Sequence, residues 1–405
     1  MQHLILFDNE TRDHLLPLTY TRPVGALRVG ILTIQEKWAR VFQSPCSFLT
    51  QDYLSDKYEM AYGEDNLIIN GALLPTPQVV RLVRQLDFSE AILLNGELLA
   101  ARLTGKQIEQ LIRDEDFGEL TGFEAKDTDI QKLNAVYDIF QLNDRAIRDD
   151  FERMTTGRQS APLSHTNTLI GPIDQLFIEP GVEIEGATIN TKTGPVYIGR
   201  NALVMEGCLV RGPLAMCEES ILKMGAKIYG PTTLGPGCKV GGEVNNVVFQ
   251  ANANKGHDGY LGNSVIGEWC NLGADTNCSN LKNTYEEVKL WNYPKGGFAK
   301  TGLQFCGLIM GDHSKAAINT MFNTGTVVGV CANIFGSGFP RNFIPSFAWG
   351  GTHGFTTFRT SKAVEMAERV MERRNTPLTV QDRLILLRVF EDTARYRAWE
   401  KEGES

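Results

Sequence analysis

The 405-residue sequence lacks any hydrophobic run long enough to cross a bilayer, since no 18 consecutive apolar residues occur. Its first residues, MQHLILFDNE, also lack the basic leader and apolar segment of a secretory signal. Positive charge is not in excess, because 40 Lys and Arg stand against 48 Asp and Glu and leave a net charge of −8. We therefore expect a soluble, cytoplasmic protein without a nucleic-acid or membrane partner.

The eight cysteines include no Cys-x-x-Cys pair. Zinc sites and disulfide-rich small domains are usually built on such closely spaced cysteines. Most of the cysteines lie instead within a six-residue repeat, near its corner positions. We expect small buried thiols, and we predict no metal site.

This repeat of apolar residues runs through the second half of the chain. A period of six matches neither the period of a helix nor that of a strand. It fits short flat strands separated by tight corners, three to a coil, with one side chain per strand pointing into a narrow prism. The repeated positions are Ile198, Val204, Val210, Met216, Leu222, Ile228, Leu234 and Val240, followed by Ile266, Leu272, Cys278, Met310, Ala316, Phe322, Val328, Ile334 and Pro340.

The hexapeptide spacing resembles the left-handed parallel β-helix, which we expect over residues 165–350. The six-residue phase slips at 245–265 and at 279–309, so loops are predicted to interrupt the β-helix there. Loops on a rigid scaffold commonly carry function, which makes these segments the first candidates for a site.

The flanking segments have different patterns. Residues 1–160 alternate short apolar runs with helical stretches, which favours an α/β domain. Residues 358–405 have helical spacing, and Thr379 with Asp382 is predicted to cap the second of two tail helices. In the α/β domain, strands are expected at 3–7, 66–70 and 91–95, and helices at 77–86 and 143–154.

A motif occupies the first predicted interruption, in KGHDGYLGNSVIGEWCNLGADTNCSNLKN. The segment resembles the acetyltransferase half of the bifunctional N-acetylglucosamine-1-phosphate uridylyltransferase/glucosamine-1-phosphate acetyltransferase family. That family has G-H-x-x-Y-L-G, then I-G and N-x-G-A, then an asparagine at fixed spacing. The later segment TGLQFCGLIMGDHSKAAINTMFNTGTVVG is similar to archaeal members. The matching residues are Gly256, His257, Tyr260, Leu261, Gly262, Ile266, Gly267, Asn271, Gly273, Ala274 and Asn280.

The resemblance implies acetyl transfer from acetyl-CoA to the amine of a sugar phosphate. Such an amine is mostly ammonium at neutral pH, and a neutral imidazole can remove its proton. The family therefore implies that His257 is the general base. It also implies that Tyr260 and Asn280 contact the sugar and reacting centre, with Asn271 on the same polar surface. Related β-helices form trimers, so a homotrimer is implied as well.

Phosphate binding needs cations, and the sequence departs from the family here. The family's lysine, 12 residues before the histidine, is replaced by Asn245. Among the lysines nearby, Lys227 and Lys289 are the predicted replacements. His313 and His353 lie outside the motif, so we predict no catalytic role for them.

The N-terminal segment resembles the nucleotidyltransferase domain of the same enzymes. The usual glycine-rich phosphate loop is absent, because the loop after LILF contains no glycine before Gly25. Ala72 stands where the domain normally has the aspartate that holds magnesium, and alanine cannot coordinate a cation. The segment TYTRPVGALRVGILTIQEKW is similar to a shortened subfamily in which a sugar nucleotidyltransferase-like domain precedes an acetyltransferase β-helix.

Two interpretations of the N-terminal domain stay open. Either nucleotidyl transfer has been lost, or a site for a nucleotide or sugar phosphate is rebuilt around Arg12, Arg22, Arg28 and Lys37. Asp8 is then a candidate metal ligand, and Mg²⁺ is expected only if this domain is active.

Three functions follow. The first is acetyl-CoA-dependent N-acetylation of an amino-sugar phosphate, with glucosamine-1-phosphate as the first candidate, in nucleotide-sugar biosynthesis. The second is a sugar-1-phosphate nucleotidyltransferase that forms a UDP- or dTDP-sugar. The third is a scaffold that binds sugar nucleotides without turnover.

Overall fold

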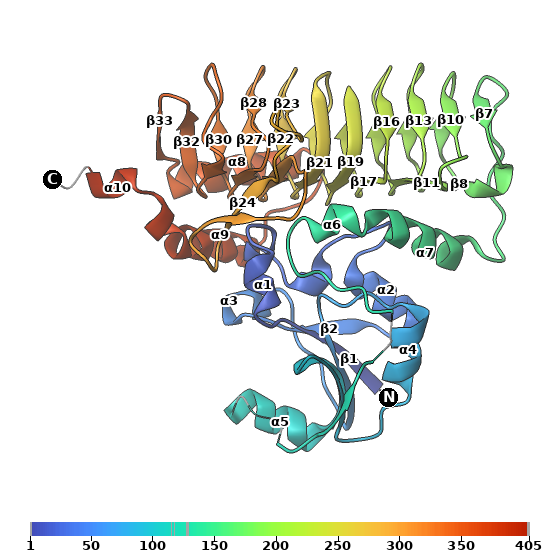
Figure 1. The fold of residues 1–405 in the computed structure, drawn as a ribbon, viewed down its shortest axis with the longest axis vertical. Helices are drawn as coiled ribbons and strands as arrows, with labels where there is room; N and C mark the ends of the chain where they lie inside the picture. The colour runs from blue at the N-terminus through green and yellow to red at the C-terminus, as the bar shows by residue number, and fades with distance from the viewer. Residues whose placement is uncertain (1, 115, 117, 127–128, 403–405) are drawn as a thin grey trace. The chain divides into compact units, whose positions relative to one another are not determined.

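The computed structural model describes residues 2–114, 116, 118–126 and 129–402. The chain forms two compact units (Figure 1). The first comprises Met1–Leu15, Arg22–Leu27 and Leu32–Ala135, and the second comprises Leu16–Thr21, Arg28–Ile31 and Val136–Ser405. The second unit thus begins before the domain boundary predicted at residue 160, because helix α7 (Asn143–Thr155) is bonded to it: Asn143 donates to the carbonyl of Pro231 at 2.9 Å. The domain ranges stay a prediction.

A six-stranded mixed sheet forms the centre of the first unit, in the order β2-β1-β3-β5-β4-β6. β1 runs parallel to both β2 and β3, so the carboxyl ends of these three strands meet at one edge. The three expected strands are confirmed as β1, β3 and β4. The bounds are β1 (Gln2–Phe7), β2 (Cys46–Leu49), β3 (Asp65–Asn70), β4 (Glu90–Leu94), β5 (Glu97–Thr104) and β6 (Thr121–Glu124).

The two best-defined helices of this unit begin at polar caps. Thr33 and Glu36 form a capping box at the start of α2, and Thr76 caps α4, which has Pro77 in its first turn. The predicted helix at 77–86 is confirmed as α4. The helices are α1 (Thr11–His14), η2 (Val24–Ala26), α2 (Ile34–Phe42), α3 (Asp52–Ser55), α4 (Pro77–Arg84) and α5 (Gly105–Asp114).

Parallel strands wind the second unit into a three-sided β-helix (Figure 1). Met216 pairs with Leu234 and Leu222 pairs with Val240, so one coil takes 18 residues. This three-sided coil is that of the left-handed parallel β-helix predicted from the hexapeptide spacing.

We call the three sides faces A, B and C. Face A contains β7 (Thr168–Ile170), β10 (Thr188–Asn190), β13 (Leu209–Arg211), β16 (Lys227–Tyr229) and the first halves of β19 (Glu243–Phe249) and β21 (Tyr260–Ile266). Face B contains β8 (Leu176–Ile178), β11 (Val196–Ile198), β14 (Leu214–Met216), β17 (Thr232–Leu234), the second halves of β19 and β21, β26 (Leu308–Met310), β29 (Thr326–Val328) and β31 (Phe343–Ile344).

Face C carries the longest unbroken series of short strands. It contains β9 (Glu183–Ile184), β12 (Leu203–Val204), β15 (Ile221–Leu222), β18 (Lys239–Val240), β20 (Asn254–Lys255), β22 (Asn271–Leu272), β27 (Lys315–Ala316), β30 (Asn333–Ile334), β32 (Ala348–Gly351) and β33 (Gly354–Thr357). A separate parallel pair joins β23 (Asn277–Cys278) to β28 (Met321–Phe322).

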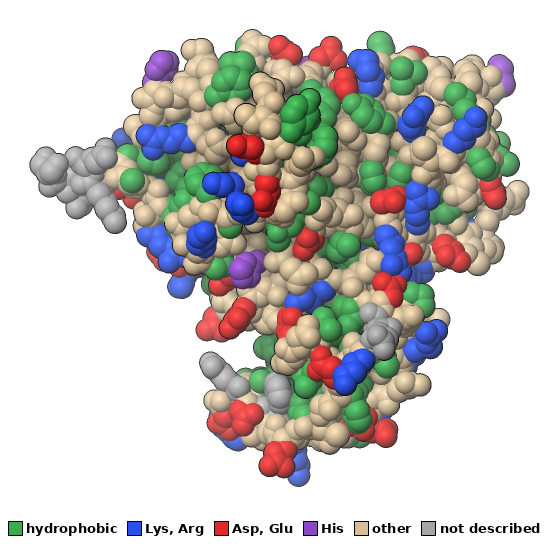
Figure 2. Space-filling model, viewed as in Figure 1, with side chains coloured by type: hydrophobic (Ala, Val, Ile, Leu, Met, Phe, Trp, Pro, Cys, Tyr) green, Lys and Arg blue, Asp and Glu red, His purple; other side chains and the backbone are tan. Residues whose placement is uncertain are grey.

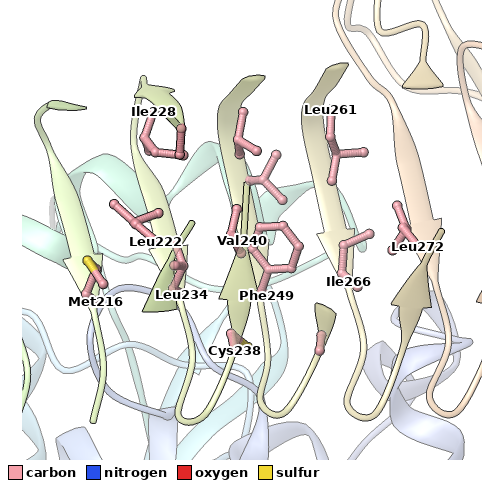
Figure 3. Packing of buried hydrophobic residues seen from close by; sticks show 14 of the residues in the cluster. Met216, Leu222, Ile228, Leu234, Cys238, Val240, Phe249, Leu261, Ile266 and Leu272 are labelled. Atoms are coloured by element: carbon pink, nitrogen blue, oxygen red, sulfur yellow. The ribbon is translucent and has the colours of Figure 1, made fainter. Parts of the chain in front are cut away.

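The interior of the β-helix is a stack of the repeated side chains. Met216, Leu222, Ile228, Leu234 and Val240 point inward from successive strands and are fully buried (Figure 3). All of the other predicted repeat positions are buried too. The six-residue apolar repeat therefore identifies the core of this unit.

The first predicted interruption, at 245–265, is wrong. The pairing continues through it, but two coils are shortened: Leu234 pairs with Phe249 after 15 residues, and Phe249 pairs with Ile266 after 17. The strands keep their places in the sheets, and residues are lost from the corners instead. The six-residue phase slips because coils are shorter here, with no loop inserted.

The second predicted interruption, at 279–309, is confirmed. Ile266 pairs with Met310, 44 positions later, so the chain leaves the 18-residue rhythm and returns. The inserted segment forms an antiparallel hairpin of β24 (Lys289–Asn292) and β25 (Gly297–Lys300).

The predicted tail helices are confirmed as α8 (Thr360–Glu372) and α9 (Val380–Asp392), and Thr379 with Asp382 forms the expected capping box. Arg374, just after α8, donates to the carbonyl of Gly237 at 2.8 Å and to Asn254 at 3.0 Å. The remaining helices of this unit are η1 (Leu18–Tyr20), α6 (Asp138–Gln141), η3 (Ile173–Gln175), η4 (Ala394–Tyr396) and α10 (Trp399–Glu402).

The cysteines are small thiols, as expected: seven are buried and Cys46 is half-buried, and all eight are free. Among the described residues, no helix is both long and apolar enough to span a bilayer. The visible surface carries Lys and Arg interspersed with Asp and Glu (Figure 2).

The stack predicts unequal effects for two methionines. Met216 is fully buried in the core, whereas Met224 lies at a corner and is 71% exposed. We expect Met216→Ala to lower the free energy of unfolding by about 2–5 kcal/mol, because it leaves a cavity among packed side chains. Met224→Ala should change it by less than about 0.5 kcal/mol. Chemical denaturation of both variants checks this, and equal losses would contradict the assignment of the core.

Candidate active site on the β-helix

His257 lies in the four-residue corner between β20 on face C and β21 on face A. The corner is tight: Gly259 has φ +114°, and a Cβ there would lie 2.2 Å from the carbonyl oxygen of Thr276. The imidazole is exposed and lines two cavities, of about 880 and 720 Å³. The motif therefore places its histidine at an accessible corner that borders two hollows.

The smaller cavity is a notch made by a shortened corner. Four residues join β15 to β16 and four join β20 to β21, but only Gly241 and Gly242 join β18 to β19. Gly242 has φ +72°, and a Cβ on it would lie 2.9 Å from the carbonyl oxygen of His257. The notch is thus walled by Lys223 and Met224 on one side and by His257 on the other.

Lys255 is a charged residue within the apolar stack. It follows Val240 by one shortened coil, points inward at the position of the repeated aliphatic residues and is 1% exposed. Its Nζ donates to the carbonyls of His257, at 2.9 Å, and Gly241, at 3.1 Å. Burial lowers its pKa to about 8. The lysine ties the His257 corner to the notch. Sequence reasoning missed this residue, although counting one 15-residue coil from Val240 finds it.

The larger cavity runs along the outward residues of face C. Lys239, Asn254, Asn271, Lys315 and Asn333 pair in register across successive strands and all line it. The tail closes this cavity from the other side, through Met366, Val370, Arg373 and Arg374. His257 and Asn271, predicted to share a polar surface, therefore line one cavity.

Lys315, which the sequence did not single out, lies in the middle of that row. Its Nζ donates to the carbonyl of Trp269 and, at 3.2 Å, to that of His313. Burial lowers its pKa. The buried His313 thus borders the base of the cavity through its backbone, and His353 is exposed.

A third cavity, of about 810 Å³, continues under α8. It shares Asn333, Met366, Val370 and Arg373 with the first and reaches Trp349, the next residue of the face C row. Its lining also includes Phe358, Arg359, Lys362 and Arg369. The two cavities therefore follow one row of residues, which starts beside His257 and ends at an aromatic and basic region.

Tyr260 and Asn280 are brought together, as predicted, but on face A. The Asn280 amide donates to the Tyr260 hydroxyl at 3.0 Å and to Asn263 at 2.8 Å. Burial raises the pKa of Tyr260, opposed by its bonds to Asn245 and Asn280. Asn245, which stands at the family's lysine position, thus belongs to this pair's network.

The two predicted phosphate lysines lie in different places. Lys227 is exposed on face A, in register with Glu243, which in turn pairs with Tyr260. Lys289 is exposed on the β24–β25 hairpin and lines neither cavity that contains His257. Phosphate binding by Lys289 stays a prediction.

In the first unit, polar side chains gather where β1, β2 and β3 end. Asp8 accepts from the Val24 amide at 2.9 Å and from the Thr50 hydroxyl at 2.7 Å, and burial raises its pKa to about 6. Arg12 donates to Asp13 and, at 2.6 Å, to the Tyr53 hydroxyl. The carboxyl edge of parallel strands is the usual ligand position in such sheets.

A second group at this edge escaped sequence reasoning because its members are far apart in the chain. Lys132 pairs with Glu97 at 2.5 Å, and Glu97 also accepts from Asn9 at 2.7 Å and Asn70 at 3.2 Å. The ion pair lowers the pKa of Glu97 against the effect of burial. Ala72, next to this group, is buried.

The other predicted basic residues are buried. Arg28 belongs to the second unit, where its backbone exchanges hydrogen bonds with the side chain of Gln250 and its guanidinium donates to the Ile31 carbonyl. Arg22 and Lys37 are buried in the first unit. The contacts of Arg28 indicate a structural role, and ligand binding by these residues stays a prediction.

Residues 4–159 match the family model described as sugar nucleotidyl transferase. The N-terminal segment belongs to that family. The chain is also 27% identical over 153 residues to the uncharacterized acetyltransferase YaiX of Escherichia coli O6:K15:H31, covering 37% of this chain and 66% of the relative. It is 29% identical over 132 residues to the bifunctional protein GlmU of Thermus thermophilus, covering 26% of this chain and 28% of the relative.

A third relative is the bifunctional sugar-1-phosphate nucleotidylyltransferase/acetyltransferase of Sulfurisphaera tokodaii, 33% identical over 93 residues and covering 23% of each chain. The matches span between about a quarter and two thirds of these relatives' own lengths. Together with the family model they confirm the resemblance to bifunctional nucleotidyltransferase/acetyltransferases.

Members of the nucleotidyl transferase family are expected to use Mg²⁺, and the residues here do not fit a protein-built site for it. In the described residues, no three His, Cys, Asp or Glu side chains lie together as metal ligands. Asp8 is engaged by Thr50 and the Val24 amide, and Glu97 by Lys132. We derive no step through a metal at this domain.

Lys255 predicts a pH-dependent stability. Its pKa is about 8 in the folded chain and near 10.5 when exposed, so the unfolded chain binds more protons between these pH values. The free energy of unfolding should therefore rise by roughly 3 kcal/mol from pH 8 to 10.5 through this residue. Relative to wild type, Lys255→Met should lack that rise, while the exposed control Lys192→Met keeps it. Denaturation at several pH values tests this, and parallel curves for all three proteins would refute it.

Proposed function

We propose that the chain is an acyl-CoA-dependent N-acyltransferase whose acceptor is the amine of a phosphorylated amino sugar, with glucosamine-1-phosphate as the first candidate and acetyl as the acyl group. The observation that carries the proposal is the motif histidine, His257, exposed at a corner between two cavities and sharing one of them with Asn271. The names of the bifunctional relatives and of the acetyltransferase relative support the same reaction class.

The proposed reaction needs one base and no covalent enzyme intermediate. The imidazole of His257 takes a proton from the acceptor's ammonium or attacking amine. The amine nitrogen attacks the thioester carbonyl and forms a C–N bond, with negative charge on the carbonyl oxygen of the tetrahedral intermediate. Collapse of this intermediate breaks the C–S bond, and the thiolate leaves and is protonated. The products are an amide and free CoA.

The row of residues under α8 suits the donor. From Asn254, beside the His257 corner, to Trp349 there are four strand steps, or about 19 Å at about 4.8 Å per step. An extended thioester arm can lie along such a row with its reactive end near His257. The far end offers an aromatic ring and, in Arg359, Lys362 and Arg369, cations for the nucleotide phosphates.

The edge that carries His257 also exposes large apolar side chains. Met224 and Ile318, in corners between faces C and A, are 71% and 67% exposed, and Leu209 follows another such corner. Exposed apolar groups along one edge favour association. This observation supports the homotrimer that the resemblance implies, packed along the edge beside the site.

The proposal is tested by His257→Ala. We expect kcat for CoA release, with acetyl-CoA and glucosamine-1-phosphate, to fall by about 10²–10⁴-fold, because the acceptor loses its general base. The matched control is His353→Ala, since that histidine is also exposed and lies outside the motif. Thiol release is followed spectrophotometrically. Unchanged turnover in the His257 variant would contradict the role of this residue.

A second candidate activity, nucleotidyl transfer to a sugar-1-phosphate, is supported by the family match over residues 4–159. Its site would be the carboxyl edge of β1, β2 and β3, where Asp8, Asn9, Glu97 and Lys132 gather. A non-catalytic scaffold would bind sugar nucleotides without either product.

For this candidate we expect release of pyrophosphate from UTP or dTTP in the presence of N-acetylglucosamine-1-phosphate. Lys132→Met should lower that rate at least about 10²-fold, because it removes a cation positioned to face phosphate, and it should leave the acetyltransferase kcat unchanged. The exposed Lys106→Met serves as control. Absence of pyrophosphate release by the wild-type protein would overturn this second activity.

A further inference from the structure

Four basic side chains surround the end of the larger cavity at which His257 lies. Lys223 and Lys239 come from neighbouring coils of the β-helix, and Arg373 and Arg374 follow α8. With Lys315, the described lining of this cavity includes five Lys and Arg and no Asp or Glu. The cavity end is therefore strongly electropositive.

These charges are not neutralised by the protein. Within the described residues, no carboxylate forms an ion pair with Lys223, Lys239, Arg373 or Arg374. The pKa of Lys239 is lowered by burial and by the repulsion of Arg374, Lys223 and Arg373. Folding thus gathers like charges that repel one another, which costs stability unless an anion joins them.

A structural explanation accounts for only one of the four. Arg374 donates to the Gly237 carbonyl and to Asn254, and so fastens the tail to the β-helix. Both acceptors are neutral, so the guanidinium keeps its charge. No such bond is formed by the ends of Lys223, Lys239 and Arg373 in the described structure, and Lys223 also lines the notch on the opposite side of the corner.

We propose that Lys223, Lys239, Arg373 and Arg374 form a binding site for a phosphate group of a ligand that reaches His257. The site rests on the proposed function in so far as the ligand is a substrate of that reaction. It replaces the phosphate lysine that the family motif has and this chain lacks at Asn245, and it uses the tail, more than 100 residues away in sequence.

Phosphate chemistry is shared by two ligands of the proposed reaction. The acceptor sugar carries a phosphate ester, and the CoA donor carries a diphosphate and a 3′-phosphate. Arginine pairs with such oxygens through parallel hydrogen bonds, and lysine adds point charge. Because the third cavity offers its own cations for the donor at the Trp349 end, we expect the four-residue site to hold the acceptor's phosphate.

The test measures binding and turnover separately on the full chain. Calorimetry with glucosamine-1-phosphate, with adenosine 3′,5′-bisphosphate and with inorganic phosphate gives three affinities for the wild type, Lys239→Gln and Arg373→Gln. We expect glucosamine-1-phosphate and inorganic phosphate to bind at least about tenfold more weakly to both variants, since each loses a charge-assisted bond. The controls are Lys192→Gln and Arg200→Gln, which remove exposed charges elsewhere on the β-helix.

Selective weakening of adenosine 3′,5′-bisphosphate would keep the phosphate site and assign it to the donor. Unchanged affinities for all three probes in both variants would overturn the proposal. The outcome for the proposed function is distinct. If His257→Ala binds the probes normally and wild type lacks turnover, the reaction is wrong and the site stands; if the variants turn over with unchanged KM for both substrates, the reaction stands and the site is wrong.

Discussion

The second unit depends on a single constraint: every inward side chain must stack on its neighbours one coil away while backbone hydrogen bonds join the coils along the axis. Strands of two or three residues leave no freedom within the faces. Changes in length are therefore confined to the corners. The chemistry follows the same division, since the faces supply the polar row of Lys239 to Trp349 and a corner supplies His257.

This constraint explains which parts of the structure the sequence could predict. One inward residue every six positions is a strong local signal, and it identified the β-helix, its core and the β24–β25 insertion. The same signal misled at 245–265, because a shortened coil and an inserted loop shift the phase alike. Lys255 was overlooked for that reason: it occupies an aliphatic position only when the count allows for a 15-residue coil.

The site was predicted where residues are close in sequence and missed where the fold joins distant segments. The spacing of His257, Tyr260, Asn271 and Asn280 matched a family motif, and the structure pairs Tyr260 with Asn280 and places Asn271 beside the histidine's cavity. Arg373 and Arg374 reach the same cavity from the tail, and no local pattern announces this. In the nucleotidyl transferase domain, Glu97 and Lys132 meet for the same reason.

The notch at Gly241-Gly242 is a hollow formed by removal of residues. Sites made by inserted loops carry the entropic cost of ordering those loops. Here the walls are the corners of the adjacent coils, already held by the β-helix, and the floor is two glycines beneath which Lys255 bonds the backbone. A repetitive fold can therefore acquire a preorganised concave site through a short deletion, and single-residue changes in corner length would adjust its depth without disturbing the core.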